Sequence, residues 1–514
     1  MRTWACWNTT RRGWLALAIV SAVLSSIGDA EARPPNVVFF LVDDLGQRDL
    51  GCYGSTFYET PNIDRLADEG VRFTSAYAAA PICSPTRASI LTGQWPQRVG
   101  ITDAIGTPAG DEWKRNTKLL PATYADRLPL ESPTIAKALK AAGYATFFAG
   151  KWHLGPKGYW PKNQGFDQNI GGTEAGHPHS YFSPYENENL PDGPKGEYLP
   201  ERLAAETVNF IEAHKDRPFL AYLSFYAVHN PMMPREDLKQ KYEAKRHQLG
   251  LSTRWGREGE RDVRLVQDYP AYAAMVEAVD IAVGKVLARL DALGLSENTL
   301  VIFTSDNGGL STSEGWPTSN VPLRGGKGWL YEGGIREPLL IRWPKLIHVG
   351  AATKPGSTID APVISPDFLP TVLDATGVRP QASQTLDGVS LLPLLRGKSL
   401  AQRALYWHFP HYNNQGGAPA AAIQRGDWKL IEWQEDHAVE LYDIAHDLSE
   451  TNNLAAKEPD RVAQLRGELH AWQKDVGATF PTTNAKYDPS KPDGRSAKRV
   501  ARPDGTSRMV RPDH

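Results

Sequence analysis

The segment Asn36–Val42, which is apolar at every position after Asn36, ends directly in two aspartates. A strand with one wet face alternates apolar and polar residues, so an unbroken run predicts a strand that is buried on both faces. Similar runs occupy residues 144–149, 219–226 and 300–305. Helical patterns lie between them, at 61–69, from Ser132-Pro133 to Gly143, and at 273–293. This alternation predicts an α/β fold whose large, mostly parallel sheet is flanked by helices.

The pattern changes after residue 390. Short strand-like segments at 405–409, 421–424, 428–431 and 440–442 are separated by turn residues, and a helical pattern covers 461–474. We therefore expect a main domain over 33–390 and a smaller antiparallel α+β domain over 391–480. Residues 481–514 are basic and nearly free of apolar residues, which predicts a flexible tail or a surface wrap.

The first 32 residues have the pattern of a signal peptide. Arg2, Arg11 and Arg12 precede a short apolar core at 14–24, and Ala30-Glu31-Ala32 supplies small residues before a cleavage site. An anchored N-terminal helix is the alternative. No later run is long enough to span a bilayer, so we expect export, to the periplasm or beyond, without stable membrane insertion. The net charge of −2 gives no reason to expect a nucleic-acid partner.

Polar residues follow two of the predicted strands. Asp43-Asp44 comes after the first strand, and Asp306-Asn307 comes after the strand at 300–305. Ligands in such sheets bind beyond the carboxyl ends of the strands, and oxygen side chains suit a hard divalent cation. The two pairs therefore favour a Ca²⁺ or Mg²⁺ site, although such residues also cap helices and begin turns.

Cys83 lies in a polar setting, within Cys83-Ser-Pro-Thr-Arg87 and shortly before Thr92-Gly93. A lone cysteine is most often a small buried hydrophobe. Here Pro85 marks the start of a helix, and Arg87 follows Cys83 by one turn. A helix N-terminus beside a guanidinium group favours an anion-binding site.

This run resembles the signature of type I sulfatases. Five further segments resemble blocks of that family and follow in the same order: 43–46, 150–155, 227–229, 304–308 and 326–338. The resemblance covers roughly residues 35–475 and is greatest to the arylsulfatase A and N-acetylgalactosamine-6-sulfatase branch. It implies an alkaline-phosphatase-like fold. It also implies hydrolysis of a sulfate ester, on a carbohydrate of the galactose or N-acetylgalactosamine type.

The resemblance further implies how the sulfate ester is attacked. Cys83 is expected to be oxidised by a maturation enzyme to Cα-formylglycine, whose hydrate offers one hydroxyl for attack on sulfur and a second for release of sulfate. In this family one divalent cation, Ca²⁺ or as the second choice Mg²⁺, is bound by four side chains and by the oxygen at position 83. Four residues of this sequence match those side chains. They are Asp43, Asp44, Asp306 and Asn307.

Five more residues take roles from the same resemblance. Arg87 is expected to hold the diol, while Lys151 and Lys327 bind sulfate oxygens. His153 acts as the base that assists elimination, and His229 acts as the acid that protonates the leaving alcohol.

Other interpretations stay open at this point. A phosphonate or phosphate monoester hydrolase of the same superfamily shares the cysteine run and the metal residues, and a catalytically silent glycan-binding protein is a second rival. Residues 176–181 and 406–412 are candidates for a sugar-pocket rim, or for packing between domains. Cys52 is predicted to be a plain buried thiol. A bridge between Cys52 and Cys83 is the alternative in an oxidising compartment, but it would destroy the proposed nucleophile. Asp49 is predicted to be structural.

Overall fold

The computed structural model describes residues 33–380, 384–493, 499–501 and 507–509. The predicted signal peptide lies outside these residues. In the part of the chain that is described, no helix combines the length and apolar character needed to cross a membrane.

Nine strands form the main sheet of the described residues, in the order β11-β2-β10-β9-β1-β6-β4-β5, with β12 beside β2. Every strand runs in one direction except β10, which is antiparallel to β2 and β9. The bounds of the strands are β1 Asn36–Val42, β2 Val71–Tyr77, β4 Ala145–Gly150, β5 Gln168–Ile170, β6 Phe219–Ser224, β9 Thr299–Ser305, β10 Arg336–Arg342, β11 Ser357–Ile359 and β12 Val363–Ile364. The predicted strands and the mostly parallel sheet are confirmed.

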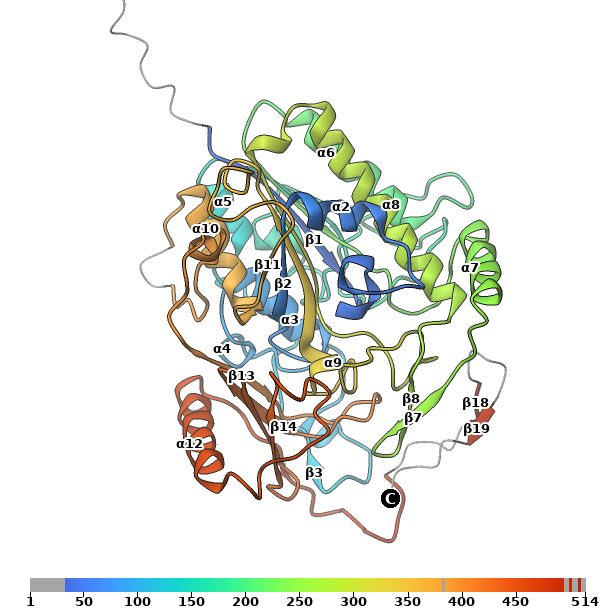
Figure 1. Ribbon diagram of the computed structural model, residues 1–514, viewed down its shortest axis with the longest axis vertical. Helices are drawn as coiled ribbons and strands as arrows, with labels where there is room; N and C mark the ends of the chain where they lie inside the picture. Colours follow the sequence, from blue (N-terminus) through green and yellow to red (C-terminus); the bar gives the residue numbers. More distant parts are fainter. Residues whose placement is uncertain (1–32, 381–383, 494–498, 502–506, 510–514) are drawn as a thin grey trace, which may run out of the picture. The chain divides into compact units, whose positions relative to one another are not determined.

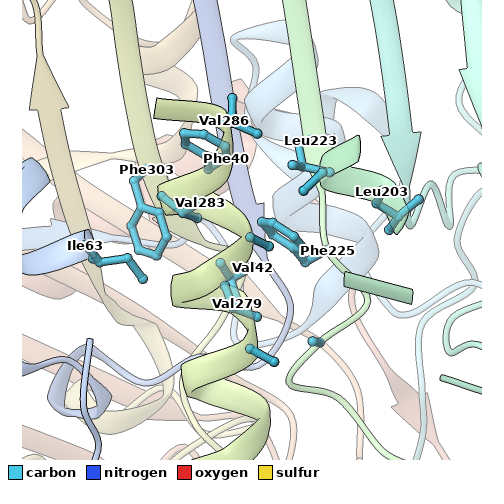
Figure 2. Packing of buried hydrophobic residues seen from close by; sticks show 14 of the residues in the cluster. Phe40, Val42, Ile63, Leu203, Leu223, Phe225, Val279, Val283, Val286 and Phe303 are labelled. Atoms are coloured by element: carbon cyan, nitrogen blue, oxygen red, sulfur yellow. The ribbon is translucent and has the colours of Figure 1, made fainter. Parts of the chain in front are cut away.

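Strand β1 explains why the central strands are apolar on both faces. Its residues alternate between two cores: Phe40 and Val42 pack on one face of the sheet, and Phe39 and Leu41 on the other. Figure 2 shows Phe40 and Val42 beside Val279 and Val283 of α8 (Pro270–Ala292).

Helices cover both faces. Helices α2 (Pro61–Glu69), α6 (Leu199–Ala213) and α8 supply residues to the first core. Helices α3 (Cys83–Thr92), α5 (Ile135–Ala141), α10 (Phe368–Thr376) and α11 (Leu392–Leu395) supply the second. Helix α7 (Glu236–Gln248) packs against α8. The predicted helices at 61–69 and 273–293 correspond to α2 and α8.

The C-terminal part contains a four-stranded antiparallel sheet with α12 (Pro459–Asp475) packed against it (Figure 1). Its strands, in order across the sheet, are β13 Ala404–Phe409, β14 Ala420–Arg425, β15 Trp428–Trp433 and β16 Val439–Asp443. A buried ionic cluster joins this sheet to the main domain, because Lys429 Nζ lies 2.9 Å from carboxylate oxygens of both Glu332 and Glu450.

The shorter elements lie in the connections. Part of the predicted tail is attached, since β17 (Thr482–Thr483) pairs with β3 (Leu119–Leu120) and Asn116 Nδ2 donates to the carbonyl of Asp488. The remaining elements are α4 Pro96–Val99, α9 Glu332–Ile335, β7 Trp255–Glu258, β8 Arg261–Arg264, β18 Arg499–Ala501, β19 Ser507–Met509 and the 3₁₀ turns Gln47–Asp49, Gly51–Tyr53, Gly110–Glu112, Pro161–Gln164, Ser296–Asn298 and Ser365–Asp367.

Candidate active site

Four neighbouring parallel strands, β9, β1, β6 and β4, end at the same edge of the sheet. Each is followed by predicted site residues: Asp306 and Asn307 after β9, Asp43 and Asp44 after β1, His229 after β6, and Lys151 and His153 after β4. Helix α3 begins with Cys83, and Lys327 precedes α9. The structure brings all ten predicted site residues to one place.

Two buried cations, Lys151 and Arg87, contact the carboxylates of Asp43 and Asp306. Lys151 Nζ lies 2.6 Å from Asp43 Oδ2, and Arg87 Nη2 lies 2.7 Å from Asp306 Oδ2 and 3.7 Å from Asp43 Oδ1. Burial raises the pKa of Asp43 well above its usual range, and Lys151 opposes the rise. Asp43 therefore needs positive charge nearby to stay ionised.

Asp44 lies at the centre of a second set of contacts. Asn307 Nδ2 donates to Asp44 Oδ1 at 2.7 Å, Lys327 Nζ donates to Asp44 Oδ2 at 2.9 Å, and His229 Nε2 lies 3.6 Å from Asp44 Oδ2. Burial favours the neutral acid, but Lys327 and His229 outweigh it, so the pKa of Asp44 is lowered. Asp44 remains an anion.

Cys83 occupies the first position of α3 and is 3% exposed. Its Sγ belongs to two groups of possible ligand atoms, each within 4.8 Å of one another, with Asp43 and Asp306 and with Asp44 and His229. Burial raises the pKa of the Cys83 thiol to about 12, although Lys151 and Lys327 oppose the rise. An unmodified thiol here stays protonated and is a poor nucleophile.

The donor set fits a hard divalent cation. Asp43, Asp44 and Asp306 supply carboxylate oxygens within one small region, and Asn307 supplies an amide oxygen. Asp43 Oδ1 and Asn307 Oδ1 are buried without a hydrogen-bond partner among the described residues. Buried oxygens with free lone pairs are the ligands that Ca²⁺ and Mg²⁺ prefer.

Each of the two histidines has one nitrogen fixed by a backbone carbonyl. His153 Nε2 lies 3.1 Å from the Ile105 carbonyl, and His229 Nδ1 lies 2.8 Å from the Asn230 carbonyl. A carbonyl only accepts, so these nitrogens carry hydrogen and the other nitrogen of each ring is available. Burial lowers the pKa of both rings well below the usual range, with Lys151 adding to the effect at His153 and Lys327 at His229.

Strained backbone accompanies these residues. Asp44 and His153 have φ of 60° and 56°, the left-handed region that non-glycine residues seldom adopt. Strain of this kind persists where the surrounding structure holds it, and it clusters at functional sites.

Several supporting residues were not predicted. Arg87 Nη1 donates to Ser224 Oγ at 2.7 Å, and Leu45 N donates to Ser305 Oγ at 3.1 Å. These serines are the last residues of β6 and β9, and that position is the signal that would have found them. Tyr181, the last residue of the candidate rim segment 176–181, is buried and donates from Oη to the His229 carbonyl at 2.8 Å, a supporting role that the sequence did not indicate.

Two remaining predictions concern Cys52 and Asp49. Cys52 and Cys83 are both free, and Cys52 is half-buried rather than buried. Asp49 accepts hydrogen bonds from Tyr272 Oη and Thr318 Oγ1, which fits its structural assignment.

The two candidate rim segments differ. The His177 ring stacks beside that of His229, with centroids 6.3 Å apart. In the other segment Trp407, His408 and His411 are buried, and Trp407 Nε1 donates to the Ala78 carbonyl of the main domain at 2.8 Å, which favours packing between the domains.

Comparison with known proteins identifies relatives over most of the chain. Residues 35–378 match the family described as Sulfatase, and residues 326–475 match N-sulphoglucosamine sulphohydrolase, C-terminal. N-acetylgalactosamine-6-sulfatase of Canis lupus familiaris is 33% identical, with 82% of this chain and 76% of the relative covered. Arylsulfatase A of Homo sapiens is 34% identical, with 88% and 90% covered. The crystal structure of Ps i-CgsB in complex with k-i-k-neocarrahexaose has a TM-score of 0.69 and 27% identity, with 87% and 95% covered.

Proposed function

The chain belongs to the sulfatase family and is a sulfuric ester hydrolase, and from this premise we propose that its substrate is a sulfated saccharide of the galactose or N-acetylgalactosamine type. Two relatives support this choice of leaving group. One is named N-acetylgalactosamine-6-sulfatase, and the other was solved with a neocarrahexaose. The observation that carries the hydrolase part of the proposal is the convergence of ten residues, of which seven follow four adjacent strands and three come from α3 and the segment before α9.

One Ca²⁺ is proposed at this edge of the sheet. The residues that would hold it are Asp43, Asp44, Asp306, Asn307 and the oxygen at position 83. When bound, a divalent cation of this kind lowers the pKa of a coordinated hydroxyl and stabilises negative charge. The free oxygens Asp43 Oδ1 and Asn307 Oδ1 support this assignment.

Position 83 is proposed to carry formylglycine, made from Cys83 by a maturation enzyme. The hydrated aldehyde supplies an oxygen nucleophile in place of the thiol. Two observations support the modification: the thiol is held protonated by burial, and the residue lies at a helix N-terminus beside three buried cations, Arg87, Lys151 and Lys327. Positive charge around a helix N-terminus favours the binding of a sulfate group at this position.

The chain's own cations would hold the sulfate group. Lys151 and Lys327 each place an ammonium group against a carboxylate of the site, and both are buried. Point charges in a water-excluded site stabilise the charge that develops on sulfate oxygens. Arg87 is bound by Asp306 and Ser224, so it is positioned to hold the group at residue 83.

The two histidines would move protons. His229 donates from Nδ1 to the Asn230 carbonyl, so an acid role requires a second proton on Nε2, which lies 3.6 Å from Asp44. Burial and Lys327 lower the pKa of this ring, and the Asp44 carboxylate opposes the fall and favours the charged ring. His153 has Nδ1 without a hydrogen-bond partner among the described residues, so this atom can accept a proton as a base.

We also propose that the protein is exported and that its chain is divided into four parts. We place the signal peptide at 1–32, the catalytic domain at 33–390, the C-terminal α+β domain at 391–480 and a basic tail at 481–514. Amino-terminal sequencing of protein recovered outside the producing cytoplasm tests the first boundary, because the mature chain is expected to begin at Arg33.

The experiment is a comparison of kcat/KM on nitrophenyl sulfate, nitrophenyl phosphate and a nitrophenyl phosphonate, together with galactose and N-acetylgalactosamine sulfates. We expect the sulfate esters to be preferred and Cys83→Ala to lose turnover while remaining folded. Preference for phosphonate or phosphate would assign the chain to the rival activity. Inactivity on every ester, in protein shown to carry formylglycine, would refute the proposal.

A further inference from the structure

Glu314 is a carboxylate beside the catalytic centre that the proposed mechanism does not use. It lies in the connection between β9 and α9, is half-buried, and has φ of 51°, in the left-handed region. A glutamate in this conformation is uncommon and has to be held by its neighbours.

The backbone of Glu314 is tied to the segment that carries the proposed general acid. Asn230 Nδ2 donates to the Glu314 carbonyl at 2.9 Å, and Asn230 directly follows His229. The Glu314 carboxylate also interacts electrostatically with the buried ammonium group of Lys327. Glu314 therefore lies near both His229 and Lys327.

One carboxylate oxygen of Glu314 is fixed and the other is not. Oε1 accepts from Asn414 Nδ2 at 2.9 Å and from Gln415 Nε2 at 2.5 Å, both in the loop between β13 and β14. No described residue donates a hydrogen bond to Oε2. The side chain is thus oriented by two amides, with one acceptor oxygen left over.

A cavity close to the His229 ring is also lined by carboxylates. A cavity of about 380 Å³ lies beside the His177 ring, which itself stacks on His229. Its lining includes Glu174, Glu186 and Glu188, and no lysine or arginine. Glu188 is paired with Lys157 at 2.6 Å and Glu186 with His179 at 3.3 Å, whereas Glu314 accepts hydrogen bonds from two neutral amides and places a negative charge beside the His229 segment. A second anionic group on the leaving sugar would therefore be repelled.

We propose that Glu314 is a specificity-determining residue, which binds hydroxyl groups of an uncharged sugar through Oε2 and excludes a sugar with a second sulfate or a carboxylate next to the scissile ester. This inference rests on the proposed function and narrows its substrate class. Sugar hydroxyls donate well to a carboxylate, and a hydrogen bond to a charged acceptor is stronger than one to a neutral acceptor.

The variant Glu314→Gln tests the charge without removing the side chain. Glutamine keeps an acceptor oxygen for Asn414 and Gln415, so the loop stays supported. Three substrates are compared: the galactose monosulfate that the unaltered enzyme hydrolyses fastest, a galactose disulfate that retains the same ester, and nitrophenyl sulfate. The matched control is Glu131→Gln, which neutralises an exposed glutamate near α5.

We expect Glu314→Gln to reduce the ratio of kcat/KM for monosulfate over disulfate by about tenfold, because one hydrogen bond to a charged group is lost and one repulsion is removed. The control should leave all three rates unaffected, and nitrophenyl sulfate reports any effect that Glu314→Gln exerts through Lys327 on every substrate alike. An unchanged ratio, or an equal loss on all three substrates, would overturn the assignment. If nitrophenyl sulfate alone is hydrolysed, both this inference and the saccharide assignment fail; if no ester is hydrolysed, the proposed function itself fails.

Discussion

Replacement of His229 by alanine tests the proton that the leaving alcohol needs. The ring is close to the reacting region, with Nε2 at 3.6 Å from Asp44 and its other nitrogen fixed by the Asn230 carbonyl. Only 13% of the side chain is exposed, but it lies at the edge of the site and not in a hydrophobic core. The variant should therefore fold.

The size of the effect follows from the chemistry of the leaving group. A sugar alkoxide is strongly basic and needs a proton in the transition state, whereas nitrophenolate leaves with little assistance. General acid catalysis contributes about 10²–10⁴-fold, which is about 3–5 kcal/mol at 1.36 kcal/mol per decade. We expect His229→Ala to lose most of that factor on a galactose sulfate and much less on nitrophenyl sulfate.

Pre-steady-state kinetics on both substrates measure this difference, with sulfur transfer shown to limit each rate. His446→Ala is the control, since that side chain is 83% exposed and contacts Asp443 in the C-terminal domain. His153→Ala should instead slow both substrates alike, because its base role comes after the alcohol has left. Equal losses on both substrates for His229→Ala would remove it from the acid role and make Lys327 the next candidate.

Three further predictions concern the metal and the stability of the fold. Asp306→Ala should lose the hard cation, about one per chain, that elemental analysis is expected to find; retention of full metal content would contradict the ligand assignment. Lys429→Met leaves Glu332 and Glu450 without their shared cation and should destabilise the protein by about 3–5 kcal/mol in denaturant titrations; a loss below 1 kcal/mol, the size expected of an exposed pair, would argue against that role. Burial raises the pKa of Asp103 to about 8 from 3.8, so its contribution to stability is present at low pH and is lost as the pH rises through about 8. Asp103→Asn should therefore flatten the fall in unfolding temperature between about pH 4 and pH 8; an unaltered slope would contradict this role of Asp103.

The central strands were predictable because burial on both faces leaves an unbroken apolar run, as in β1 and β9. Strand β10 was not predicted. Its Arg336, Glu337 and Pro338 interrupt the apolar pattern, and nothing local indicates that it enters the sheet antiparallel to its neighbours. Helix α7 was missed for a related reason, because its polar sequence has no continuous apolar stripe.

The candidate site was predictable where motif and topology coincide. Residues that directly follow strands, such as Asp43 and Asp306, are brought together by the sheet itself. Ile105 and Glu314 were not predictable, because each reaches the site through a long connection whose path depends on contacts distant in sequence. Tertiary packing, and not local pattern, places them.

The most direct test of the account is the mass of the peptide that contains residue 83, measured on the same preparation whose sulfatase activity is assayed. We expect an aldehyde at this position, in a fraction of the molecules that rises with specific activity. Unmodified Cys83 throughout a fully active preparation would contradict it.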